Sequence, residues 1–527
     1  MKKINKTLVH WHRKLVWFAL ATLIVWGISG VLHPIMSWTG PKAVKFFPPK
    51  IIVSAAELNK LPEVLSLLGE NKISTSKVVP SQQGLLLQNS YVDAFKQSGW
   101  MNSGNTVNSK STANSLDIIQ REYYDLANGR KLANYDEKQA RWLANYYTGF
   151  TDKDIDSVEL IKEFSDEYPW VNRLLPVFRV SYSSEDGLVA FVHTETSALA
   201  SLTNDWRTAL QKVFRLLHTW NWADDLSIAR AIVIALMMVT LLAMAVTGIG
   251  LVMALSWRKI PNGYRRWHRL LSYAIWLPVL GWSFSGFYHL LQNELVDRVS
   301  GMQLDKPWVL ATTKNDIDVS WLDKYSQQQF NSITLIRGKE NQLQFRLGLA
   351  STNASGNEMK HHQREGKNAD QNISRNQRFK GIPKETGAIY IDPQNGKRLD
   401  INDQQRAEWL AAEHLKVSAD KISDAQLITR FGNGYDFRNK RLPVWRLAID
   451  DEAMTHLFID PATGILVDKN RNLDRVESWS FSVLHKWNIL NPFVGRFIRD
   501  ILIVFVLITA LFFAGLGISI RLSAKRT

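Results

Sequence analysis

Six histidines recur at matching places in the two halves of this 527-residue chain, each at the end of an apolar segment. They are His12, His33, His218, His268, His289 and His485. Trp-His-Arg at 11–13 recurs at 267–269, and in both copies a Ser-Gly motif that ends in histidine follows at the same distance. Leu-His-x-Trp-Asn at 217–221 recurs at 484–488. Since histidine is costly inside a bilayer and its neutral imidazole is a common metal ligand, this arrangement indicates haem binding.

Four apolar runs of about 20 residues are long enough to cross the hydrocarbon core of a membrane. The runs are Leu15–Met36, Ala231–Leu255, Leu270–Leu291 and Ile501–Ile520. Basic residues gather at 2–14, 258–269 and 521–526, so these flanks are expected on the cytoplasmic side. We predict a multi-pass protein of the bacterial inner membrane with both termini cytoplasmic, and an uncleaved first helix.

The composition excludes several other classes of protein. Without cysteine, the chain has no disulfide, no thiolate ligand for haem and no iron–sulfur cluster. The net charge of +15 arises partly from the basic membrane flanks, and no soluble basic face indicates a nucleic-acid partner. Membrane lipid is the expected surrounding, and both a monomer and a homodimer stay open.

The predicted fold is a membrane protein of four transmembrane helices from a tandem duplication, with two periplasmic α+β domains. The predicted segments are the N-terminus with helix 1 (1–38), the first periplasmic domain (39–217), helix 2 (218–257), a cytoplasmic turn (258–269), helix 3 (270–292), the second periplasmic domain (293–484), helix 4 (485–521) and a cytoplasmic tail (522–527). The matching motifs keep a constant offset of 267 residues (485 − 218) through the outer domains and into the membrane.

Local patterns predict the elements of the outer domains. Helical spacing of apolar residues occurs around 55–69 and 403–414. The segments rich in strand-forming residues are Val177–Tyr182, Leu188–His193, Val444–Ile449 and Thr455–Ile459. Asn-Gly at 128–129 and 395–396 predicts hairpin turns. Trp142 and Trp409 are expected to pack in the cores of these domains.

The helix-borne histidines suggest one haem on the cytoplasmic side. On a straight helix His12 and His33 lie about 31 Å apart along the axis and can face the same bundle interior. His268 is expected to meet His12 near a pseudo-twofold axis, forming a bis-histidine pair that leaves no open position on iron. Arg13 and Arg269 would then pair with haem propionates.

The other four histidines are expected together on the periplasmic side, where they can ligate one haem or two. His33 and His289 are preferred as ligands, with His218 and His485 completing a second site or shaping the first. Zinc is a weaker alternative, because no carboxylate or cysteine recurs beside these residues. His10 has no counterpart and is expected to be a bystander or an alternate ligand.

The chain resembles the PepSY-associated transmembrane family, which includes iron-regulated inner-membrane proteins and ferric-siderophore reductases. The residues that carry the resemblance are Trp-His-Arg at 11–13 and 267–269, Ser-Gly with the following histidine at 29–33 and 285–289, and Leu-His-x-Trp at 217–220 and 484–487. The resemblance covers nearly the whole chain. It implies four transmembrane helices, two PepSY-like outer domains, b-type haem held by histidines, and electron transfer to a periplasmic ferric chelate.

We therefore expect a haem-dependent oxidoreductase with two b-type haems that reduces a ferric siderophore for iron uptake. A separate quinol or flavoprotein would supply electrons, because the chain has no fused flavin domain. One alternative keeps the haem but delivers electrons to another periplasmic acceptor. The other is a PepSY membrane protein that binds or regulates without catalysis and carries no haem. The sequence identifies no catalytic residue beyond the histidines.

Overall fold

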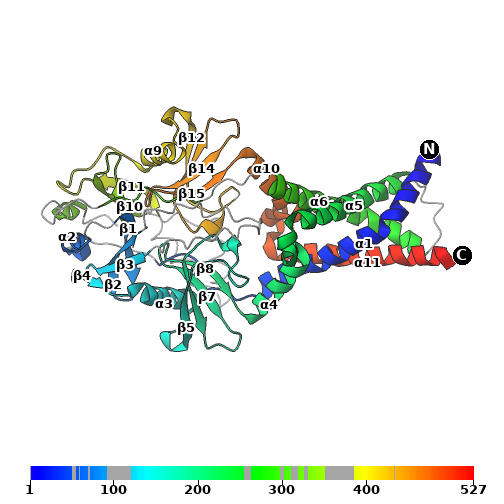
Figure 1. The fold of residues 1–527 in the computed structure, drawn as a ribbon, viewed down its shortest axis with the longest axis horizontal. Helices are drawn as coiled ribbons and strands as arrows, with labels where there is room; N and C mark the ends of the chain where they lie inside the picture. The colour runs from blue at the N-terminus through cyan, green and yellow to red at the C-terminus, as the bar shows by residue number, and fades with distance from the viewer. Residues whose placement is uncertain are drawn as a thin grey trace.

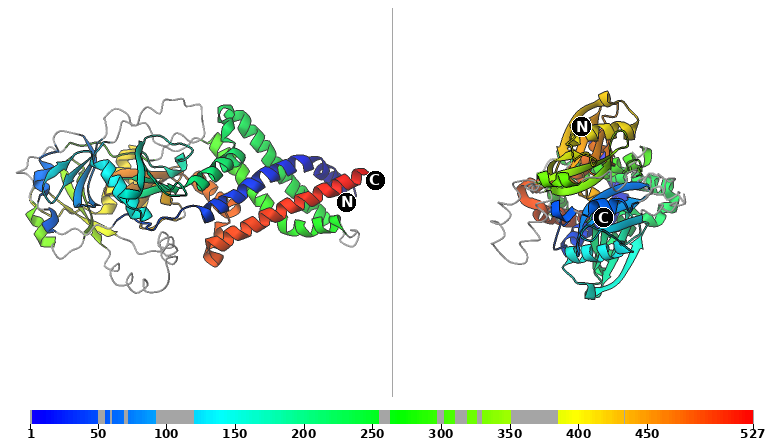
Figure 2. Two further views of the ribbon diagram at one scale, coloured as in Figure 1. Left: turned by 90° about the horizontal axis from the view of Figure 1, so that it is seen from below. Right: turned by 90° about the vertical axis from the view of Figure 1, so that its left-hand side faces the viewer.

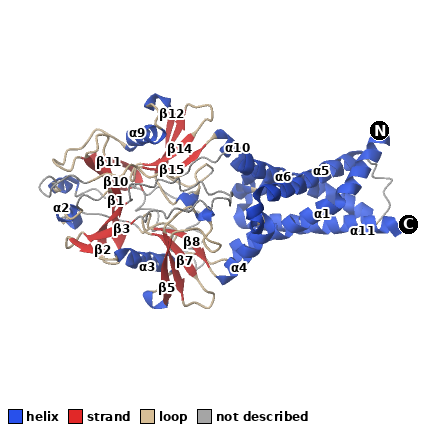
Figure 3. Cartoon of the chain, viewed as in Figure 1, coloured by secondary structure: helices blue, strands red, loops and turns tan. Residues whose placement is uncertain are grey.

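The computed structural model of the chain describes residues 2–49, 55–58, 60–68, 72–91, 120–254, 263–296, 302–309, 319–325, 330–350, 385–432 and 434–526. The molecule is elongated, with a helical bundle at one end and β-sheets at the other (Figure 1; Figure 3). The two chain ends lie together at the end of the bundle farthest from the sheets (Figure 1). We call the part that contains the sheets the outer region.

Four helices of the bundle are long and apolar enough to cross a membrane, as the apolar runs predicted. They are α1 (Lys2–Thr39), α5 (Ser227–Ala254), α6 (Tyr264–Leu295) and α11 (Asn491–Arg526). Both α1 and α6 pack against α5 and α11, so α1 and α6 stand diagonally across the bundle. Figure 2 shows α1 and α11 running side by side. The chain therefore has the architecture of a multi-pass membrane protein.

Two shorter helices lead from the outer region into the bundle. The helix α4 (Asp205–Phe214) packs on α1, and α10 (Asn472–Ser480) packs on α6. Both segments fall within the ranges predicted for the outer domains, 39–217 and 293–484. In the structure the helical entry to the bundle begins earlier, because both helices are amphipathic and lie along the membrane helices.

The largest sheet takes strands from both halves of the chain. Its order is β11-β10-β9-β1-β2-β3-β4, and all neighbours are antiparallel. The strands are β1 (Ile73–Ser81), β2 (Gly84–Tyr91), β3 (Gln120–Asp125), β4 (Arg130–Leu132), β9 (Phe330–Arg337), β10 (Leu343–Ala350) and β11 (Glu385–Ile391). The halves join where Ser76 faces Leu335 and Lys77 faces Thr334. The two segments expected as separate domains thus share one sheet.

One face of this sheet carries a core built from both halves. Its first-half members include Leu61 and Val64 of α2 (Leu61–Leu65), and its second-half members include Phe345 and Ile389. The helix predicted around 55–69 is interrupted, with a 3-10 turn over Ala55–Leu58 ahead of α2. Pro62 lies in the first turn of α2, where its missing N–H costs nothing.

Two four-stranded antiparallel sheets have the same order in each half. The strands are β5 (Ile155–Ile161), β6 (Val177–Tyr182), β7 (Val189–His193) and β8 (Ala198–Thr203) in one, and β12 (Ile422–Ile428), β13 (Val444–Ile449), β14 (His456–Asp460) and β15 (Ile465–Asn470) in the other. The helix α3 (Tyr135–Thr148) covers the first sheet and α9 (Asp403–Leu415) the second. All four predicted strands and the helix predicted at 403–414 are confirmed to within a residue.

The predicted packing of the outer region also holds at smaller scale. Trp142 packs against the core between α3 and its sheet, and Trp409 against the core between α9 and its sheet. Asn128 and Gly129 form the turn between β3 and β4, while Asn395 and Gly396 lie in a turn after β11. Both glycines have positive φ, which the turn requires.

Buried charges tie the halves together between these sheets. Arg441 forms an ion pair with Glu195, which also lies 3.3 Å from the Lys77 Nζ. The Glu195 and Arg441 side chains are 6% and 5% exposed. Burial alone would raise the pKa of Glu195, but Arg441 and Lys77 lower it well below its usual value. Because one partner comes from each half, this contact fixes the halves against each other.

Candidate functional site

His218 and His485 meet where the bundle joins the outer region. His218 is the next-to-last residue of the π-helical turn η4 (Arg215–Thr219), and His485 is the last residue of the π-helical turn η11 (Phe481–His485). Such turns occur often at functional sites. Their ring centroids lie 6.3 Å apart with the planes at 82°. The two histidines come from segments that are far apart in the sequence, so the fold brings this pair together.

Tryptophans hold both turns in place in the same way. Trp26 Nε1 donates to the His218 carbonyl oxygen at 3.0 Å, and Trp282 Nε1 donates to that of His485 at 3.1 Å. The Trp26 ring also stacks on Trp220, with 5.8 Å between centroids, and Trp282 makes the matching contact with Trp487. Trp220 and Trp487 both have a φ of 52°, which is uncommon outside glycine, and each caps the start of the 3-10 helix that follows its π-helical turn.

Two buried serines determine which nitrogen of each imidazole carries the proton. The Ser29 hydroxyl donates at 2.7 Å to the carbonyl oxygen four residues earlier, and Ser285 does the same. A hydroxyl has one hydrogen, so each serine oxygen must accept from the histidine that it faces. These contacts are 2.9 Å to His218 Nδ1 and 3.2 Å to His485 Nδ1. We therefore assign the proton to Nδ1, which leaves the Nε2 lone pair available.

These two imidazoles would hold the iron of a haem through Nε2, and the iron would supply one-electron chemistry. Metal-bound histidines usually donate their second ring nitrogen to an outer partner, as both do here. Within the described ranges, no group of three or more histidine, aspartate or glutamate side chains could hold a bare metal ion.

His33 and His289 flank this central pair through aromatic rings. Phe214 lies between His33 and His218, with centroid distances of 6.2 and 4.6 Å. Phe481 lies between His289 and His485, at 4.7 and 4.4 Å. His485 is within electrostatic range of the other three, so all four histidines gather at this end of the bundle, as expected. The central position belongs to the pair from the π-helical turns, whereas sequence analysis gave preference to the helix-borne pair.

Glu477 makes the two sides of this cluster different. Its Oε1 lies 2.6 Å from His289 Nδ1, whereas the residue at the matching position of the first half is Leu210. Repeat analysis missed Glu477 because it has no counterpart. The spacing of Glu477, Phe481 and His485 at four-residue intervals on one helical path could have found it.

His12 and His268 lie near the opposite end of the bundle, within electrostatic range of each other. Each ring is half-buried and sits against a glycine of a neighbouring helix. A Cβ at Gly248 would be 3.6 Å from His12 Cε1, and one at Gly517 would be 3.3 Å from His268 Cε1. These glycines leave space for the imidazoles, so both rings face neighbouring helices.

In this second pair, a side chain accepts a hydrogen bond from His12 but none does so from His268 among the described residues. The Thr247 hydroxyl donates to the carbonyl oxygen of the residue four positions earlier at 2.7 Å, so it accepts from His12 Nδ1 at 3.2 Å. His268 instead stacks on Phe513 with 4.1 Å between ring centroids. Ala514 stands where the repeat would place a threonine, and no described side chain accepts from His268 Nδ1.

Arg13 and Arg269, which were expected beside a haem held by His12 and His268, lie in different surroundings. Arg269 donates to the Val252 carbonyl oxygen at 2.9 Å, on the side of the bundle formed by α5 and α6. Arg13 is exposed and lines a cavity between α1 and α11 together with His10. The two guanidinium groups have different neighbours, and their pairing with haem propionates stays a prediction.

No protein-family model matches the chain, and neither the curated proteins nor the solved structures contain a significant match. The resemblance to the PepSY-associated family stays a prediction that rests on the motifs. The structure itself defines the class more broadly, as a membrane protein of four long apolar helices with a β-sheet region at one end.

Proposed function

We propose that this chain is a haem-binding membrane oxidoreductase that passes electrons to a ferric chelate outside the cytoplasmic membrane. The observation that carries the proposal is the His218–His485 pair, whose Nδ1 protons are fixed by two buried serines. Bound haem iron would supply one-electron chemistry, and the second histidine pair near the other end of the bundle would hold a second haem. A separate quinol or flavoprotein would donate the electrons.

The residues of the chain would position and tune the iron rather than react themselves. Ser29 and Ser285 keep Nε2 free, and the indoles of Trp26 and Trp282 hold the carbonyl groups of the turns that carry the histidines. The acceptor would gain one electron per iron, converting Fe(III) to Fe(II). Hard oxygen ligands hold the less charged ion more weakly, so reduction favours release from the chelate.

The proposed placement is the bacterial inner membrane, with both termini in the cytoplasm and the outer region in the periplasm. Basic residues at the bundle end that holds both termini support this orientation. We also propose that the chain arose by tandem duplication. The support is the equal order of the four-stranded sheets and the matching hydrogen bonds of Ser29 with His218 and Ser285 with His485.

The proposal is tested on the purified full-length protein in two steps. A pyridine haemochrome assay gives the haem content, and His218→Ala and His485→Ala should each lose the same part of it. His193→Ala is the matched control, because His193 is buried in the outer region away from the bundle. The reduced protein is then mixed anaerobically with a ferric hydroxamate chelate. Haem that stays reduced would refute the ferric reductase, and a colourless protein would refute haem binding.

A further inference from the structure

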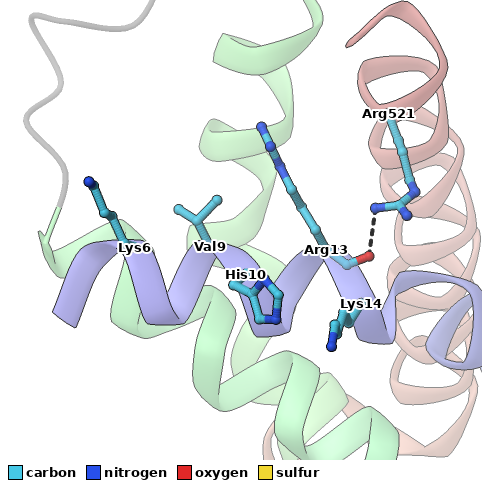
Figure 4. A pocket seen from close by; sticks show the side chains of 6 residues that line it. All are labelled: Lys6, Val9, His10, Arg13, Lys14 and Arg521. Atoms are coloured by element: carbon cyan, nitrogen blue, oxygen red, sulfur yellow. Dashed lines mark hydrogen bonds between the residues drawn. The ribbon is translucent and has the colours of Figure 1, made fainter. Parts of the chain in front are cut away.

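A cavity of about 570 Å³ opens at the end of the bundle where the two chain termini meet (Figure 4). Its lining residues are Lys6, Val9, His10, Arg13, Lys14 and Arg521. Five of them lie on α1 at intervals of three and four residues, which places them on one face of the helix. The sixth lies near the end of α11 (Figure 4). The cavity is wide open to its surroundings rather than enclosed.

Among the described residues, the lining carries four cations and no carboxylate. No described acidic side chain forms an ion pair with Lys6, Arg13, Lys14 or Arg521, although the structure contains many such pairs elsewhere. Concentrated positive charge of this kind raises the local concentration of anions. The chemistry of the cavity therefore selects a negatively charged ligand.

Arg521 provides directed hydrogen-bond donors in addition to charge. Its Nη1 donates to the Arg13 backbone oxygen at 2.6 Å, which ties α11 to α1 (Figure 4). Its Nε is buried and has no hydrogen-bond partner in the part of the chain that the structure describes. A guanidinium group offers five N–H donors in a fixed plane, a geometry that matches phosphate oxygens.

Aromatic residues place the cavity at the depth of lipid headgroups. Trp11 and Trp267 are 51% and 59% exposed at this end of α1 and α6. Exposed tryptophans of transmembrane helices collect at the boundary between hydrocarbon and water. Lys14 Nζ lies 5.6 Å from the Trp11 ring centroid, so cavity and indole share one level.

We propose that this cavity is a binding site for a phosphate group, supplied by the headgroup of an anionic phospholipid. The cations would hold the phosphate, Val9 would contact the apolar part of the lipid, and the ligand would join α1 to α11. This site is separate from the histidine pairs, because the cavity lies on a different face of α1 from His12.

The experiment is native mass spectrometry of the full-length protein in mild detergent with dioleoylphosphatidylglycerol or dioleoylphosphatidylcholine. Wild type should retain one phosphatidylglycerol in preference to phosphatidylcholine. Each lost cation should weaken retention about fivefold, in Lys14→Gln and in Arg521→Gln. Arg265→Gln is the matched control, because Arg265 is exposed at the same end of the bundle and does not line the cavity.

The outcomes separate the two sources of phosphate. Displacement of phosphatidylglycerol by millimolar inorganic phosphate, with the same variant pattern, supports the site and assigns it to a soluble phosphate. Equal retention of the two lipids by wild type overturns the proposal, as does an equal loss in Arg265→Gln. Lys14→Gln leaves the Arg521–Arg13 hydrogen bond intact, so its effect does not depend on the joint between the helices.

Discussion

Replacing Ser285 with alanine tests whether the central histidines bind iron through Nε2. The substitution removes the acceptor of the His485 Nδ1–H, which lies 3.2 Å from the serine oxygen, and leaves that proton in a site where Ser285 is 1% exposed. Without the acceptor either ring nitrogen can carry the proton, so the ligand is no longer held in one tautomer. Ser29→Ala should act equally on His218, because the contact there is 2.9 Å.

The expected size follows from outer partners of metal-bound histidines. Their loss typically lowers metal affinity by about 10–100-fold, which is about 1.4–2.7 kcal/mol. The assay measures the rate at which haem leaves the purified protein for an excess of apomyoglobin. We expect this rate to rise by about 10–100-fold in Ser285→Ala and in Ser29→Ala.

Ser283→Ala is the control for this prediction. Ser283 is fully buried on the same helix and donates to the Val279 carbonyl oxygen at 2.6 Å, but within the described structure it bonds to no histidine. It therefore reproduces the loss of a buried hydroxyl without the loss of a histidine partner. Equal haem loss rates in Ser283→Ala and Ser285→Ala would refute the role of the serine and with it the assignment of Nε2.

Three further outcomes are expected from named contacts. Thr247→Ala should increase haem loss from the inner site alone, by about tenfold, since it removes an outer histidine partner; an equal increase at the outer site would contradict this. Glu477→Gln removes a negative charge beside His289 and should raise the midpoint potential of the outer haem if that histidine is a ligand; an unchanged potential would assign the ligands to the central pair. Glu195 has a lowered pKa when folded, so the stability that it contributes is present above about pH 4.5 and is lost as the pH falls below that value. Glu195→Gln should lower the free energy of unfolding by about 3–5 kcal/mol at pH 7, because it leaves Arg441 buried without its charged partner. The melting temperature of this variant should change less than that of the wild type between pH 5 and pH 3.

The transmembrane helices and the small outer sheets follow from local patterns in the sequence. Apolar runs near 20 residues allow few alternatives in a membrane, and alternating residues such as those of Val177–Tyr182 define a strand by their period. The repeated motifs allowed further predictions, because a motif that occurs twice at a constant offset shows which positions in the two halves correspond. In this way the histidine positions and both Asn-Gly turns could be predicted.

The shared sheet could not be predicted in the same way. The pairing of Ser76 with Leu335 joins two strands that are distant in the sequence. The residues of neither strand indicate which other strand it pairs with. The same limit applies to Glu195 and Arg441, whose contact depends on how the halves are packed. Sequence spacing also gave no reason to prefer the central histidine pair, since a π-helical turn changes the direction of its side chains.

The antiparallel joint between β1 and β9 bears on how such a chain could begin. If the chain arose by the tandem duplication proposed above, two half-length copies could pair their β1 strands in the same antiparallel way, and the short ancestor would close this sheet as a symmetric dimer. Linking the copies end to end makes assembly independent of concentration. It also frees each copy to diverge, and a glutamate could then arise beside one histidine while leucine stayed in the other half.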